Sequence, residues 1–150
     1  VATNVDCYVY VAYEGSLGDR ALLFPSSAAG LDNRVQRYAD KAMPSTNGFF
    51  TMDNNPGQEH VVVVASPSPI PELEAIVRER TATRDISLTP DENRSFNAVM
   101  ERYTGRASGA STRNIVYEPE TTGPNVGGYY SQPQPGFTEP VIINITLNHR

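Results

Sequence analysis

PGQEHVVVVAS, residues 56–66, places four consecutive valines directly after a turn signal. Pro56 and Gly57 favour a turn, and a β-branched run that follows such a turn is typical of a strand. Pro67 and Pro69 then end the run. Because the valine run is apolar on both of its faces, we expect a strand that is buried on both faces and lies centrally in a sheet.

Alternation in residues 5–14 predicts a second strand. One face holds Val5, Cys7, Val9, Val11 and Tyr13, and the other holds Asp6, Tyr8, Tyr10, Ala12 and Glu14. A period of two over this length indicates a half-buried strand, so we expect Tyr8 and Tyr10 on its outer face. The glycine-containing residues 15–19 predict a hairpin loop, and residues 20–24 predict the return strand before Pro25.

Shorter strands are expected between this hairpin and the valine run. Residues 33–38 would direct Val35 inward, and residues 48–52 would place Phe50 and Met52 on one face. Both segments are short and are bounded by polar turn residues. They therefore predict short additions to the sheet.

After Pro69 the apolar period changes from two to the helical value. Leu73, Ile76 and Val77 share one face after Pro71, which suits the first turn of a helix. A second helix is predicted over residues 90–104, because Thr89 and Glu92 have the spacing of a capping box. Its apolar stripe consists of Phe96, Val99, Met100 and Tyr103. Residues 83–88, between the helices, alternate and predict a strand with Ile86 and Leu88 directed inward.

The C-terminal part combines an irregular segment with one clear strand. Residues 107–140 are largely rich in Gly, Pro, Thr, Gln and Tyr, apart from a possible strand at residues 114–118. Residues 141–147 alternate again, with Val141, Ile143, Ile145 and Leu147 on one face. Such a strand has no local partner. It can pair with the sheet of its own chain or with that of a neighbouring molecule.

Composition and motifs give no support for catalysis or cofactor binding. The net charge is −5 and the basic residues are scattered, which argues against nucleic-acid binding, and no segment has the ~20 apolar residues of a membrane helix. Cys7, the one cysteine, is expected to be a buried thiol. His60 and His149 are far apart in the sequence and do not form a metal-site signature. We expect neither an enzyme nor a bound metal or cofactor.

Several short motifs in the first half, taken in order, resemble a known bacterial family. They are the strand Tyr8-Val9-Tyr10-Val11, the strand end Leu22-Leu23-Phe24-Pro25, then Asp32-Asn33-Arg34-Val35, Met43-Pro44, Phe49-Phe50, Pro56-Gly57-Gln58-Glu59 and Ala65-Ser66. Over about residues 5–70 the chain is similar to the bacterial domain of unknown function family four-three-eight-four. The resemblance implies a small β-sandwich-like module of secreted, surface or signalling-associated proteins, and it implies no known activity.

These observations together predict one mainly β domain with accessory helices. We expect an antiparallel, immunoglobulin-like β-sandwich with two short helices and a long irregular C-terminal segment that ends in a strand. The expected division of residues 1–150 is a β module at 5–70, a helical extension at 71–106, a Gly/Pro-rich linker at 107–140 and a C-terminal strand at 141–150.

For function, we expect a non-enzymatic assembly module of a bacterial surface or secreted protein. Addition of the strand at residues 141–147 to a neighbour, or exchange of the whole tail, would give a homo-oligomer, fibre or filament. The alternative is a monomeric recognition module of a larger bacterial surface or signalling protein, which binds a peptide or glycan. Its contact surface would use aromatic side chains, namely Tyr8, Tyr10, Tyr129, Tyr130 and Phe137. The favoured interpretation of these aromatic residues is that they cover the sheet, ahead of a protein interface and of glycan binding.

Overall fold

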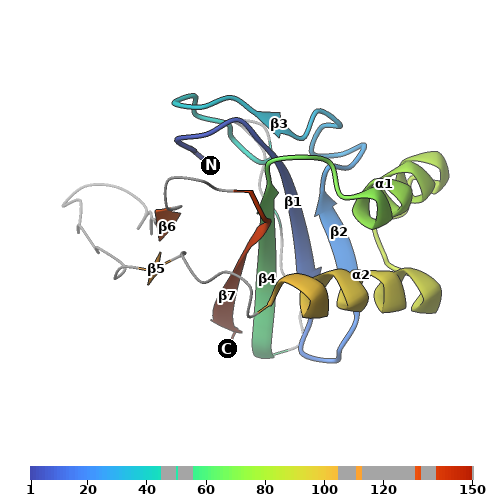
Figure 1. Ribbon diagram of the computed structural model, residues 1–150. Coiled ribbons are helices and arrows are strands. Elements are labelled where there is room, and N and C mark those ends of the chain that lie inside the picture. The colour runs from blue at the N-terminus through green and yellow to red at the C-terminus, as the bar shows by residue number, and fades with distance from the viewer. Residues whose placement is uncertain (45–49, 51–55, 105–110, 113–130, 133–137, 150) are drawn as a thin grey trace.

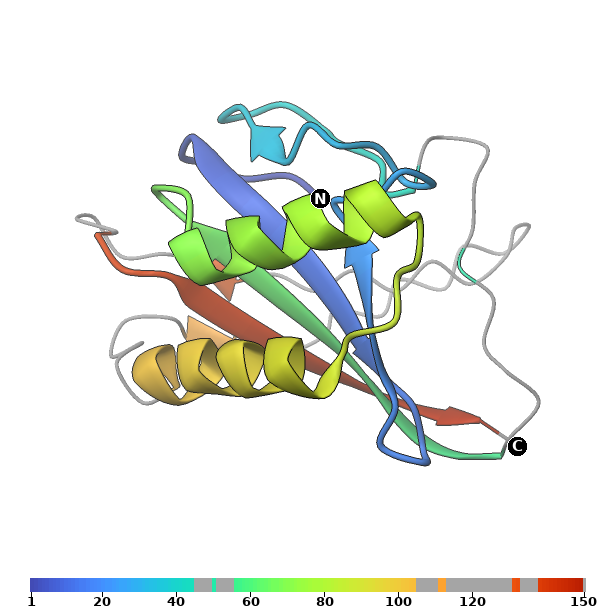
Figure 2. The same cartoon turned by 90° about the vertical axis from the view of Figure 1, so that its right-hand side faces the viewer.

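The computed structural model describes residues 1–44, 50, 56–104, 111–112, 131–132 and 138–149. Its main element is one five-stranded antiparallel sheet, and two helices lie against one face of that sheet (Figures 1 and 2). The predicted antiparallel, mainly β fold with two helices is therefore confirmed. In the described part of the chain, neither helix is long and apolar enough to cross a membrane.

The valine run forms a central strand, as its sequence predicts. The path of the sheet is β2-β1-β4-β7, and β3 pairs with β1 beside β2. The strands are β1 (Cys7–Glu14), β2 (Arg20–Phe24), β3 (Arg34–Val35), β4 (Gly57–Ser66) and β7 (Val141–His149). β4 lies between β1 and β7 and is antiparallel to both.

The two helices begin and end with local signals that the sequence contains. Helix α1 (Pro71–Thr83) has Pro71 in its first turn. Helix α2 (Pro90–Tyr103) begins with the predicted capping box, because Thr89 Oγ1 accepts from Glu92 N at 3.3 Å and Glu92 Oε2 accepts from Thr89 N at 2.7 Å. This arrangement satisfies two backbone donors that a helix start otherwise leaves unpaired.

Alternation along the strands divides the apolar side chains between two clusters, one on each face of the sheet. The cluster under the helices includes Tyr10, Ala12, Leu22, Val62, Val64, Leu73, Ile76, Leu88, Phe96 and Val99. The cluster on the other face consists of Cys7, Val9, Val11, Leu23, Phe24 and Val35. Within β4, Val62 and Val64 are buried under the helices, whereas Val61 and Val63 are half-buried on the opposite face.

The segment between the helices corrects one prediction. Residues 83–88 do not form a regular strand, and Ile86 is exposed, although Leu88 is buried as expected. Only Ser87 forms an isolated bridge, opposite Ala21. Ile86 points outward because this connection runs along the edge of β2 and contributes Leu88, not Ile86, to the core under the helices.

An immunoglobulin-like sandwich is not confirmed. In the described residues, the only ladder besides the main sheet joins β5 (Ser111–Thr112) to β6 (Ser131–Gln132). The strand predicted at 114–118 and most of that at 48–52 lie outside the described residues, and Phe50 is exposed and not in a strand.

Candidate functional site

The C-terminal strand pairs with the sheet of its own chain. Nine residues of β7 stand opposite nine of β4, from Val141 opposite Ala65 to His149 opposite Gly57. The sequence left open whether this strand pairs within its chain or with a neighbour, and the structure shows pairing within the chain. Among the strands that the structure describes, β7 is therefore the last at one end of the sheet (Figure 1).

The outer edge of β7 is the surface on which we base a function. In an antiparallel ladder every second residue directs its N–H and C=O away from the neighbouring strand. Throughout the described segments, the only strand that pairs with β7 is β4, and the β5–β6 ladder is separate from this sheet. No other described strand therefore pairs with the outward N–H and C=O groups of β7.

The opposite edge of the sheet is covered. The peptide N–H of Leu22 donates to Ile86 O at 2.8 Å, and the N–H of Leu88 donates to Arg20 O at 2.8 Å. The connection between α1 and α2 thus occupies one N–H and one C=O of β2 on the side that faces away from β1. The two edges of the sheet consequently differ in their capacity to accept a strand.

β7 lacks the features by which proteins usually protect an exposed edge. Such features are charged side chains, proline, bulges and short strand length. The sequence of β7, VIINITLNH, contains no Asp, Glu, Lys, Arg or Pro, and its register with β4 is unbroken over nine residues. By contrast, the β1–β2 pairing is shorter, contains a register shift and carries Arg20 and Glu14. The long edge of β7 is therefore suited to backbone pairing.

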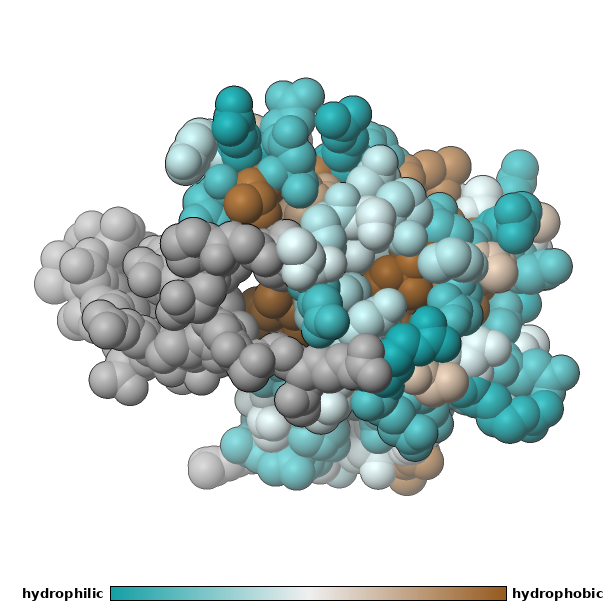
Figure 3. Space-filling view, viewed as in Figure 1, coloured by the Kyte–Doolittle hydropathy of each residue, from teal (hydrophilic) through white to brown (hydrophobic). Residues whose placement is uncertain are grey.

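The side chains of β7 form one apolar row and one polar row. Ile143, Ile145 and Leu147 are half-buried, and Val141 is buried. In the register of the ladder, these four stand on the same face as Val61 and Val63. The other row begins with Ile142, which is half-buried, and continues with Asn144, Thr146 and Asn148, which are exposed. A space-filling view shows apolar residues in separate areas among hydrophilic ones (Figure 3).

Sequence reasoning named only the apolar row of this strand. The polar row, which consists of Asn144, Thr146 and Asn148, belongs to the same edge, and its signal was the alternation already visible in the sequence. Thr146 Oγ1 lies 3.2 Å from Nδ1 of His60 on the neighbouring strand. The surface thus includes both rows and the backbone between them.

Tyr10 is not on an exposed face, and that prediction is wrong. Its side chain is buried under the helices, where its hydroxyl donates to Glu74 Oε1 at 2.5 Å and accepts from Ile70 N at 3.2 Å. Burial, together with the hydrogen bond to Glu74, raises the pKa of Tyr10. Tyr8 is half-buried and packs against the same cluster.

Tyr10 therefore connects helix α1 to the sheet, and neither tyrosine forms an exposed platform. Their face is covered because both helices lie on it (Figure 2). The other aromatic residues of the predicted contact surface, Tyr129, Tyr130 and Phe137, lie outside the described residues.

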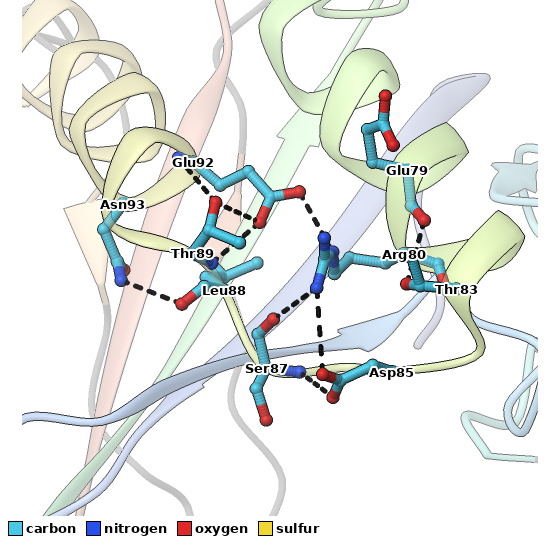
Figure 4. Close-up of polar contacts among 9 residues, drawn as sticks. All are labelled: Glu79, Arg80, Thr83, Asp85, Ser87, Leu88, Thr89, Glu92 and Asn93. Carbon is cyan, nitrogen blue, oxygen red and sulfur yellow. Dashed lines mark hydrogen bonds and ion pairs between the residues drawn. The ribbon is translucent and has the colours of Figure 1, made fainter.

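Several titratable side chains on and between the helices form hydrogen bonds or ion pairs with one another. Arg80 of α1 donates to Glu92 Oε1 at 3.0 Å and to the carbonyl oxygen of Ser87 at 2.9 Å, so it joins the end of α1 to the start of α2 (Figure 4). Glu72 forms an ion pair with Arg102 at 2.7 Å. Each of these contacts connects parts of the helical layer.

The cysteine and the potential metal ligands of the described residues have the following surroundings. Burial raises the pKa of the Cys7 thiol, so the reactive thiolate is disfavoured. Over the residues that the structure describes, no three His, Cys, Asp or Glu side chains are grouped as metal ligands. The distinctive feature of this molecule is therefore the edge of β7.

Comparison with known proteins identifies one family. A comparison with curated proteins found no match, and a comparison with solved structures found none. Residues 1–69 match the family described as "Domain of unknown function (DUF4384)". The matched range includes β1, β2, β3 and β4, whereas both helices and β7 follow it. Over its first 69 residues the chain therefore resembles the DUF4384 family, as the order of its sequence motifs predicted.

Proposed function

We propose that this chain is a non-enzymatic assembly module that associates with further copies of itself through the outer edge of β7. The observation that supports this function is the nine-residue edge strand without charge, proline or bulge. The opposite edge of the sheet is covered by the connection at residues 85–88. Proteins that avoid association rarely have a long edge strand without charged residues, proline or a bulge.

Physical chemistry favours strand addition at such an edge. A strand that joins β7 forms ladder hydrogen bonds, each of which contributes a net ~0.5–1.5 kcal/mol. It also extends the apolar row of Ile143, Ile145 and Leu147, whose side chains are half-buried in the single copy. Because the edge is uncharged, it offers no attraction for a charged peptide, and the same uncharged strand on a second copy is a suitable partner.

The setting and the wider assembly remain predictions from the sequence and from the family resemblance. We propose a bacterial surface or secreted protein, which needs no cofactor for this role. Exchange of the tail is a second route to association, because β7 of one copy can form the same nine pairs with β4 of another. A fibre or filament would result where such contacts are head-to-tail.

A charge placed on the edge tests the proposed function. Asn144 is exposed on β7, and Asn144→Lys would bring a charge into any strand pairing there. Gln36→Lys adds the same charge at an exposed position just after β3 and serves as the control. The measurement is the molar mass by sedimentation equilibrium over a concentration series.

We expect the unmodified protein and Gln36→Lys to associate and Asn144→Lys to be shifted towards the monomer by at least tenfold in dissociation constant. A protein that is monomeric up to ~1 mM, where association would be weaker than about −4 kcal/mol, would overturn the proposal and favour a monomeric recognition module. Association that Asn144→Lys leaves unchanged would also overturn it.

A further inference from the structure

The geometry points to a closed dimer in which two copies of β7 pair antiparallel about a two-fold axis that passes near Thr146. This inference rests on the proposed function. It specifies the symmetry of the association, the register of the paired strands and the largest number of copies that associate. The two five-stranded sheets would become one continuous sheet. The helices of both copies would lie on the same face of that sheet, because the axis is perpendicular to it.

The first step concerns the number of edges that can take part. Head-to-tail growth through the sheets requires a second edge, and the candidate is β2. The hydrogen bonds that join Leu22 to Ile86 and Leu88 to Arg20 already engage two backbone groups of that edge. A contact between β7 of one copy and β2 of the next would have to displace them. Pairing of β7 with β7 requires no such loss, so assembly by this route ends at two copies.

The second step concerns the side chains that would meet. Under a two-fold axis that passes through a residue, the numbers of paired residues add up to a constant even sum. Odd-numbered residues then face odd-numbered ones and even-numbered residues face even-numbered ones, so each row faces itself. The apolar row therefore meets the apolar row, and the polar row meets the polar row. An axis at Thr146 pairs Thr146 with its own copy, Asn144 with Asn148, and Ile145 with Leu147.

The third step concerns charge. A two-fold axis at Thr146 brings the side chains nearest the axis close to their own copies, so that an ionised residue there would lie near a like charge. From Val141 to Asn148 the strand has no ionisable side chain. Self-pairing of β7 is therefore free of the like-charge repulsion that commonly prevents it.

The fourth step places the axis along the strand. Ile142, near the start of β7, packs against the cluster that contains Phe96 and Val99 of α2, so the helix lies close to this half of the strand. The C-terminal end of β7 extends beyond α2 (Figure 2). An axis near Ile142 would bring the two α2 helices towards each other, whereas an axis near Thr146 separates them.

Cysteine cross-linking tests this register. Directly opposite residues of an antiparallel pair have Cα atoms ~4.5–5.5 Å apart, within the range that a disulfide spans. Residues displaced by four positions along the strands are ~14 Å apart, which a disulfide cannot span. The native Cys7 is 1% exposed and would not compete under mild oxidation.

We expect Thr146→Cys to form a disulfide-linked dimer by itself. Asn144→Cys alone and Asn148→Cys alone should not form one, but an equimolar mixture of these two variants should. Products are read by mass spectrometry of non-reduced samples. In parallel, the molar mass of the unmodified protein, measured by sedimentation equilibrium, should rise with concentration to a plateau at twice the monomer mass.

The possible failures are distinguishable. Association that is sensitive to Asn144→Lys but continues beyond two copies would overturn the closed dimer and leave the proposed function standing. Cross-linking of all three single variants would indicate parallel pairing and overturn the two-fold register, again without affecting the proposed function. A strictly monomeric protein would overturn both.

Discussion

Replacement of Arg80 by methionine removes the ionic connection between the two helices and keeps most of the aliphatic stem. The side chains of Arg80 and Glu92 are only 10% and 11% exposed, so water screens their contact poorly. Arg80 also donates to the carbonyl oxygen of Ser87 (Figure 4). This contact holds the connection that covers the edge of β2. The substitution therefore affects both the helical layer and the covered edge.

The magnitude follows from what the substitution leaves behind. Removal of one partner of a buried ion pair costs about 3–5 kcal/mol when the other charge is left without compensation. Here Glu92 retains its contacts with the backbone N–H and the hydroxyl of Thr89, at 2.7 and 2.8 Å. We therefore expect a loss of about 2–3 kcal/mol in the free energy of unfolding, because the remaining hydrogen bonds offset part of the cost.

Urea unfolding followed by circular dichroism measures this loss, and thermal unfolding should show a fall of about 8 °C. Arg94→Met is the matched control, because Arg94 and its partner Asp91 lie on the same helix but are 74% and 83% exposed. That control should lose less than ~0.5 kcal/mol. An Arg80→Met variant as stable as the control would refute the reasoning that burial makes this pair important.

Two further predictions concern the sheet and the N-terminal loops. Tyr10→Phe keeps the ring but removes the hydroxyl that bridges Glu74 and the backbone of Ile70. We expect the free energy of unfolding, measured with urea, to fall by ~1–2 kcal/mol. An unchanged urea midpoint would contradict this role of the hydroxyl. The hydrogen bond from Lys41 holds the pKa of Asp32 below its ordinary value, so its stabilisation is present above the unfolded-state pKa and is lost on acidification below about pH 4. Lys41→Met should flatten this acid dependence of the unfolding free energy, and an unchanged profile would show that the contact does not contribute.

Local sequence signals were sufficient to predict several secondary-structure elements. The valine run, the alternation of residues 7–14 and the capping box at Thr89 each correspond to an observed element, because strand period and helix capping depend on residues close together in sequence. The strand over residues 141–149 was visible for the same reason. The resemblance of the first 69 residues to DUF4384 was also readable from the order of motifs.

Burial of individual side chains was harder to predict. Tyr10 alternates with Asp6 and Glu14, so its face looks polar in sequence, yet α1 and α2 pack on that face and bury it. Ile86 differs in the opposite sense, because it was predicted to be buried but is exposed to solvent. Residues 85–88 pair with β2 through their backbone, which leaves this side chain outside the core. Both outcomes depend on which face of the sheet receives the helices.

The sequence by itself determined the periodicity of the strands and helices and the absence of charge on the last strand, since these properties reside in neighbouring residues. Only the tertiary structure decided that this strand pairs with β4 and ends the sheet. It also decided that the connection between the helices covers the opposite edge. Strand order depends on contacts between residues that are distant in sequence, and no local pattern specifies which edge is left for a partner.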